Sequence, residues 1–158
     1  MKKKGGVDQV FIYLMVIIVV GVLFLVGSRA IGDIINRSCE IGETTFKSNL
    51  EDSLNRNSRF GSHEAKGMRA PCNYDMICFT NHSLDSNRVP YEYTIIKEEL
   101  EAETGNNVFI SKRDLMLPFL EAPTIVTNEP VVCINASGGT FNFLMQGAGG
   151  GLVLITPS

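Results

Sequence analysis

A run of seventeen apolar residues near the N-terminus, Val10 to Val26, constrains this chain more than any other feature. No charge interrupts it, and Gly21 is its one residue that is neither aliphatic nor aromatic nor Met. A helix on the surface of a soluble domain keeps a polar face, and this run has none. As a helix it covers roughly 26 Å, close to the ~30 Å hydrocarbon core of a bilayer. We therefore expect a membrane-spanning helix with a helical continuation to residue 36.

Charges on the two sides of the run predict its orientation. Three lysines at positions 2 to 4 precede it against one acidic residue, Asp8, whereas the charges that follow it nearly cancel (Arg29, Asp33, Arg37). Positive residues remain cytoplasmic, so the N-terminus is expected inside the cell and the chain from about residue 28 onward outside. The expected location is the cell membrane, with a single pass and the C-terminal domain displayed on the surface.

The length and charge of the chain limit the domain and its partners. With 158 residues the chain is expected to hold one domain, and the 98 residues from Gly61 onward are enough for a small core. The chain has 14 Lys and Arg against 17 Asp and Glu; with three lysines and Asp8 inside, the outer part has 11 against 16. This acidic balance argues against nucleic acid and anionic lipid as main partners, because both require basic patches.

Residues 1–9 form a short basic leader, and three interpretations of it remain open. The leader is the cytoplasmic tail of a single-pass anchor, or the apolar run is the core of a cleaved secretory signal with small residues, Ser28 and Ala30, before the cut. The third interpretation comes from the resemblance described next, which implies that Lys4, Gly5 and Gly6 form a processing site on the cytoplasmic side of a helix that stays on the mature protein.

The Lys3-Lys4-Gly5 leader before a long apolar helix resembles that of archaeal type IV prepilins. In that family a dedicated peptidase cuts after the glycine, and the resemblance implies a filament subunit whose helix packs against copies of itself. Many pilins carry Glu at the fifth mature position, where this chain has Val10. The layout also resembles small single-pass archaeal proteins with a compact outer domain, on the segments Phe60-Gly61-Ser62 and Ile77-Cys78-Phe79. The alternative is therefore a monomeric anchor with an extracellular ligand- or protein-binding domain.

Beyond the membrane, polar residues at 36–38 and a glycine at 42 weaken the helical pattern, and a second amphipathic helix is expected from about residue 44 to residue 56. Thr44 or Thr45 would cap its first turn. Phe46, Leu50 and Leu54 form an apolar stripe that we expect to pack on the following sheet. The expected regions are a leader (1–9), a transmembrane helix with its extension (10–36), an amphipathic stalk (37–60) and an extracytoplasmic domain (61–158).

The outer domain is expected to be α+β, with a small, mostly antiparallel sheet and one or two packed helices. Tyr91 to Glu103 predicts a helix with Ile95, Ile96 and Leu100 inward and its acidic residues in water. Short apolar or alternating runs predict six strands: Met76–Thr80, Val108–Lys112, Ala122–Thr127, Pro130–Asn135, Thr140–Gln146 and Leu152–Thr156. The rest of residues 61–90 is expected to be irregular.

Glycine-rich segments predict two hairpin turns, at Ser137–Gly139 and Gly147–Gly151. Between them, Phe141, Phe143 and Met145 occupy alternate positions and are expected to face the core. Prolines mark strand edges or starts, where a missing N–H is tolerated: Pro118, Pro123 and Pro130.

Four cysteines lie on the expected outer side, where thiols can be oxidised: Cys39, Cys72, Cys78 and Cys133. They allow three pairings, and the sequence does not select one. We expect Cys72–Cys78 to close a short loop and Cys39–Cys133 to join the stalk to the sheet. In the alternative, some remain reduced as small buried hydrophobic residues.

Candidate chemical sites are few. His63, Cys72, Cys78 and His82 could form a zinc site, but their spacings of eight, five and three intervening residues differ from those of common zinc sites. Gly147–Gly151 is followed by a strand pattern and has no Lys-Ser/Thr pair, so it does not predict a phosphate loop. With two histidines, no GxSxG and no HExxH, no catalytic set is indicated. We expect no enzyme, no metal, no cofactor and no small-molecule substrate.

Three Asn-X-Ser sequons lie on the expected outer side and are candidate glycosylation sites: Asn36, Asn81 and Asn135. Asn81, in a loop, and Asn135, at a strand end beside a turn, are the stronger candidates.

Overall fold

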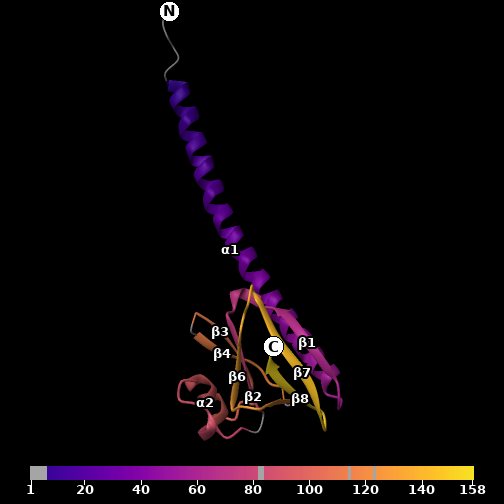
Figure 1. The fold of residues 1–158 in the computed structure, drawn as a ribbon. Helices are drawn as coiled ribbons and strands as arrows, with labels where there is room; N and C mark the ends of the chain where they lie inside the picture. Colours follow the sequence, from indigo (N-terminus) through magenta and orange to yellow (C-terminus); the bar gives the residue numbers. More distant parts are fainter. Residues whose placement is uncertain (1–6, 82–83, 114, 123) are drawn as a thin grey trace, which may run out of the picture. The chain divides into compact units, whose positions relative to one another are not determined.

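The computed structural model describes residues 7–81, 84–113, 115–122 and 124–158, with side chains at these positions except 7–9, 32–33 and 35–36. Two compact units divide the chain, Met1–Ile41 and Gly42–Ser158. The helices are α1 (Val7–Asn57) and α2 (Thr94–Glu101), with short 3-10 turns at Pro71–Asn73 and Ser86–Arg88 (Figure 1). The strands are β1 (His63–Arg69), β2 (Met76–Thr80), β3 (Val108–Lys112), β4 (Leu115–Leu120), β5 (Ile125–Thr127), β6 (Val131–Asn135), β7 (Thr140–Gly149) and β8 (Leu152–Pro157). The predicted α+β class, with an apolar N-terminal helix, is confirmed.

The first element, α1, is a single helix of 51 residues, whereas two separate helices were expected from the sequence. Thr44 and Thr45 are exposed residues inside this helix, so neither caps a helix start. A glycine such as Gly42 destabilises a helix by about 0.5–1 kcal/mol. Ending one helix and starting another would instead leave about eight backbone groups without helical partners. The continuous helix is therefore the lower-energy arrangement.

Two four-stranded sheets form the domain, with strand orders β1-β7-β8-β5 and β4-β3-β2-β6 (Figure 1). Every strand pair in them is antiparallel except β5 with β8. The prediction of mostly antiparallel pairing is confirmed, although the strands divide between two sheets.

One core joins the facing sides of the two sheets to the C-terminal part of α1. The stripe of Phe46, Leu50 and Leu54 is buried there, as predicted. The rings of Phe46 and Phe141 lie 5.9 Å apart, and those of Phe79 and Phe143 lie 5.6 Å apart, so the contacts run from helix to sheet and from sheet to sheet. The inward positions of β7, including Met145, are fully buried, which confirms the predicted alternation.

A second, smaller core lies under α2, on the other side of the β4-β3-β2-β6 sheet. Ile96 is fully buried against Phe109 and Cys78, and Leu100 packs at its margin. Ile95 is 36 % exposed, so its predicted inward position is wrong. Because β2 and β3 are covered on both faces, they read as continuous apolar runs rather than alternating ones.

Strands β1 and β4 were not expected from the sequence. In β1, Glu64 and Lys66 face inward but form an ion pair at 3.2 Å, and Met68 is the strand's one buried residue. Polar side chains thus occupy both faces and conceal the period-2 pattern. Pro118 lies within β4, an edge strand where proline is tolerated, and Pro130 immediately precedes β6. Pro123 lies outside the described residues.

The two predicted hairpin turns have different outcomes. Ser137–Gly139 does form a tight turn, but the strands it joins, β6 and β7, belong to different sheets, so the predicted hairpin there is wrong. Strands β7 and β8 do pair as a hairpin, with the turn reduced to Gly150 and Gly151. Gly147 instead lies inside β7 and is buried.

Candidate membrane-spanning segment and surface sites

The segment Val10–Ile31 of α1 is long and apolar enough to cross a membrane. Its 22 residues cover about 33 Å, slightly more than a hydrocarbon core of ~30 Å. Within the described part of the chain nothing buries this segment. Its large apolar side chains are exposed, from 52 % at Ile18 to 79 % at Phe24. A continuous apolar surface of this kind requires cover by lipid or by protein.

The few polar groups of this segment are compatible with an apolar environment. The Ser28 hydroxyl donates a hydrogen bond to the carbonyl oxygen of Leu25 at 3.0 Å, so it is satisfied within the helix. Arg29 lies two residues from the end of the segment, where its long side chain can reach the headgroup region. The candidate processing residues Lys4, Gly5 and Gly6 lie outside the described residues.

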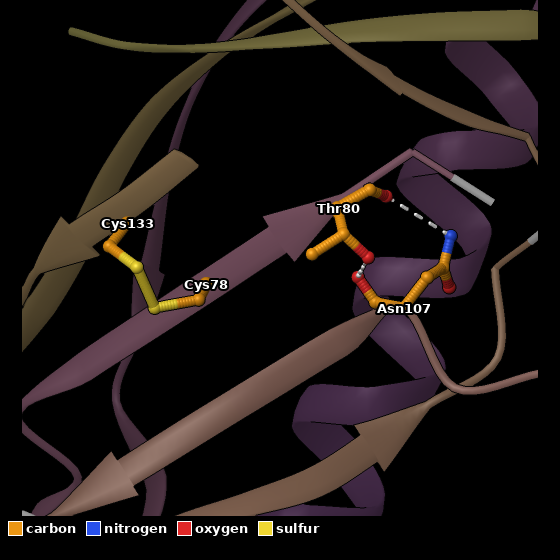
Figure 2. The surroundings of a disulfide bond; sticks show 4 residues. All are labelled: Cys78, Thr80, Asn107 and Cys133. Carbon is orange, nitrogen blue, oxygen red and sulfur yellow. Dashed lines mark hydrogen bonds between the residues drawn. A yellow bond between two sulfur atoms is a disulfide. The ribbon is translucent and has the colours of Figure 1, made fainter. Parts of the chain in front are cut away.

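A disulfide joins Cys78 of β2 to Cys133 of β6 (Figure 2). The expected pairs Cys72–Cys78 and Cys39–Cys133 are therefore wrong. The two strands pair antiparallel with Cys78 directly opposite Cys133, and their Cα atoms are 4.0 Å apart. Cys39 and Cys72 are disulfide-bonded as well, so none of the four cysteines is free.

The register of the two strands accounts for this pairing. Strands β2 and β6 have five residues each, whereas the strand predicted from the sequence, Pro130–Asn135, begins one residue before β6. When two such strands align antiparallel end to end, the third residue of one faces the third residue of the other. Those residues are the two cysteines. What the sequence lacked was the information that β2 and β6 are neighbours.

A buried polar network lies beside the disulfide, and no pattern in the sequence predicted it. Asn107, 1 % exposed, donates through its side-chain amide to the Ala122 carbonyl at 2.8 Å and accepts from the Ala122 N–H at 2.7 Å. Figure 2 also shows its contacts with Thr80, whose carbonyl accepts from the amide at 3.4 Å. The network ties β2 and β3 to the segment after β4, and its role is structural.

Two further polar contacts fasten the C-terminal part of α1 to the domain. The Tyr74 hydroxyl donates to Glu43 at 2.6 Å, and burial together with this bond raises the pKa of Tyr74 to about 12. The Asn57 amide donates to Glu64 at 2.5 Å, and this bond, with help from Lys66, holds the pKa of Glu64 below its usual range.

Neither the candidate zinc ligands nor the glycine-rich segment Gly147–Gly151 forms a metal or phosphate site among the described residues. Cys72 and Cys78 are both disulfide-bonded and have no thiolate for zinc, His63 is exposed, and His82 lies outside the described residues. Gly147–Gly151 leads into strand β8, so no helix N-terminus faces an anion there.

The acidic residues of α2 lie mostly on its exposed face. Lys97 approaches Glu101 at 3.9 Å, one turn along the helix, in a solvent-exposed pair. Glu99 accepts hydrogen bonds from the Thr104 hydroxyl at 2.7 Å and from the Asn106 amide at 3.1 Å, which fastens the segment after the helix. These contacts are typical of a solvated helix face and its end.

The three sequons lie in different local structures. Asn135 is exposed at the end of β6, and Asn81 is half-buried after β2. Asn36 lies within α1, and its side chain is outside the described set. Comparisons of the chain with models of known protein families, with curated proteins and with solved structures gave no match.

Proposed function

We propose that this chain is a membrane-anchored, surface-displayed structural or interaction protein, and that it acts as a pilin-like filament subunit. The observation that carries the proposal is the uncovered apolar segment Val10–Ile31, which forms the first part of a helix whose last part belongs to a folded domain. Its partners in this role are membrane lipid before assembly and copies of itself afterwards.

The hydrophobic effect supports this role. Each buried large aliphatic side chain stabilises an assembly by about 1.5–3 kcal/mol relative to its exposed state. The segment presents such side chains all round its circumference, so lipid or several neighbouring helices can cover it, whereas a single flat partner surface cannot.

The cysteines support an outer location for the domain. Cys78–Cys133 is a disulfide, and Cys39 and Cys72 are also oxidised. Disulfides persist outside the cytoplasm and are rare inside it. This agrees with the orientation expected from the three N-terminal lysines, in which the N-terminus is cytoplasmic.

The second candidate function is that of a monomeric single-pass anchor with an extracellular ligand- or protein-binding domain. The observation that favours it is Val10, which stands where many pilins carry a glutamate. In this role the segment Val10–Ile31 is covered by lipid alone.

Two measurements distinguish the filament subunit from the monomeric anchor: the intact mass of the protein from its native cells, and its release when those cells are mechanically sheared. A chain that begins at Gly6 and is released by shearing in long assemblies supports the filament role. A chain that begins at Met1 or Lys2 and stays with the membrane favours the anchor. A chain that begins at Ile31 and is free in the medium would contradict both. Reduction should add about 4 Da, one hydrogen for each of the four thiols.

A further inference from the structure

The Asn-X-Ser sequons are the sequence motifs to which the proposed function gives no role. An oligosaccharyltransferase has to reach the asparagine amide and the hydroxyl two residues later together, on the outer side of the membrane. We propose that Asn135 is the N-glycosylation site of this chain. The proposal rests on the outer location of the domain in the proposed function.

In the sequon at Asn135, both side chains that the transferase must contact, those of Asn135 and Ser137, are accessible to solvent. Asn135 ends β6, the last strand of the β4-β3-β2-β6 sheet, and both Asn135 and Ser137 are exposed. The neighbouring Gly138 and Gly139 are exposed too and present no side chains to obstruct a large sugar.

Backbone hydrogen bonds hold this sequon at the surface. Ala136 donates its N–H to the Asp75 carbonyl at 2.7 Å. Ser137 and Thr140 exchange backbone bonds at 2.8 and 3.1 Å across the turn. All these bonds are made by main-chain groups, so they do not occupy the Asn135 amide or the Ser137 hydroxyl.

The sequon at Asn81 is less accessible. Asn81 is half-buried and directly follows Thr80, which is fully buried and accepts, through its carbonyl, the amide hydrogen bond of Asn107. Exposing the Asn81 amide to an enzyme would therefore disturb the end of β2.

The sequon at Asn36 lies within the helix α1. Residues i and i+2 of a helix do not share a face, so positions 36 and 38 lie on different sides of α1. Asn36 also follows Ile31 by five residues, about 8 Å along the helix, which is at the outer edge of the headgroup region of a membrane crossed by Val10–Ile31.

The modification is a group transfer from a lipid-linked oligosaccharide. The amide nitrogen of Asn135 forms a bond to the anomeric carbon of the sugar as the bond from that carbon to a phosphate oxygen breaks. The lipid phosphate leaves with the bonding electrons, and the nitrogen loses one proton to a base of the transferase. The product is an N-linked glycan on an otherwise unchanged chain.

Translation of the full chain into microsomes that contain an oligosaccharyltransferase tests the proposal. The expected product carries a single endoglycosidase-sensitive glycan. Asn135→Gln and Ser137→Ala should both abolish it, whereas Asn36→Gln and Asn81→Gln should leave it. Asn142→Gln is the matched control, because Asn142 is an exposed asparagine outside any sequon.

Protease protection of the same microsomes separates the two proposals. A protected domain without a glycan, or with a glycan that survives Asn135→Gln, would overturn the assignment and leave the outer location standing. A domain that protease digests would overturn the outer location and the assignment together.

Discussion

Asn107 shows how one side chain can replace backbone pairing. Its amide meets both the N–H and the carbonyl of Ala122, as an adjacent strand would, at a place where β4 has ended and β5 has not begun. Buried backbone groups require such partners, because water cannot reach them. The Ala122 carbonyl also accepts from the Ile125 N–H at 3.1 Å, so the Ala122 N–H is the group that depends on the Asn107 side chain.

Asn107→Leu should lower the free energy of unfolding by about 1–3 kcal/mol, because it leaves the Ala122 N–H buried and unpaired, whereas the Ala122 carbonyl keeps the hydrogen bond from the Ile125 N–H at 3.1 Å. Chemical denaturation followed by circular dichroism measures this, since the chain has no tryptophan. The control is Asn106→Leu, next along the chain, whose amide bonds are near the surface; it should change stability by less than about 1 kcal/mol. Equal effects of the two changes would contradict the assigned role.

Tyr74 gives the domain a dependence on alkaline pH. Its pKa is about 12 in the folded chain, against an ordinary value of 10.0, because burial and the bond to Glu43 favour the neutral phenol. A group with a raised folded pKa contributes stability that is complete below its unfolded pKa and is lost as the pH rises through the folded pKa. The contribution should therefore be complete below about pH 10 and disappear towards pH 12.

Phenol absorbance during titration and denaturation at several alkaline pH values test this expectation. Tyr74→Phe should remove a late-titrating phenol and flatten the loss of stability above pH 10. Tyr91→Phe is the control, because Tyr91 is 93 % exposed and should leave the pH dependence unchanged. A wild-type profile that matches Tyr74→Phe throughout would refute the assignment.

Strand β7 passes close to the segment that follows α1. Gly147 exchanges backbone hydrogen bonds with this segment, donating to Ser62 at 2.9 Å and accepting from Gly61 at 3.4 Å. A β-carbon at Gly147 would overlap the carbonyl oxygen of Arg59. The glycine is therefore required by packing between elements, not by the flexibility of a turn.

Gly147→Ala should lower the free energy of unfolding by about 2–4 kcal/mol, because two backbones would have to separate. Gly67→Ala, in β1, is the matched control. A β-carbon there meets only the side chains of Asn142 and Thr140, and these can move aside. Its effect should stay below about 1 kcal/mol, and thermal unfolding of both variants in the same detergent provides the comparison.

At the scale of the whole molecule, the membrane interpretation requires that lipid or neighbouring helices cover the apolar segment Val10–Ile31. Val19→Arg places a charge near the middle of this segment, which disfavours membrane insertion by about 2.5–3.5 kcal/mol. The fraction of the chain that resists alkaline extraction from membranes should fall sharply, whereas Val19→Leu should retain it. Normal membrane yield of Val19→Arg would contradict the membrane interpretation.

Much of the architecture could be predicted from local patterns. The apolar run at Val10, the stripe of Phe46, Leu50 and Leu54, and the alternation around Phe143 each depend on neighbours in sequence, and each was found as expected. Strands β2 and β3 agree with their predicted bounds for the same reason. Hydrophobic periodicity depends only on residues that are near in sequence, so it is the same whichever strands become neighbours in the fold.

Features that depend on which strands become neighbours could not be predicted. The Cys78–Cys133 bond, the division into two sheets at Ser137–Gly139, and the contact of Gly147 with Arg59 all join residues distant in sequence. The inward ion pair of Glu64 and Lys66 likewise makes sense only beside Asn57 at the end of α1. Local preferences amount to a few tenths of a kcal/mol per residue, whereas burial and pairing in the assembled core decide among topologies by several kcal/mol.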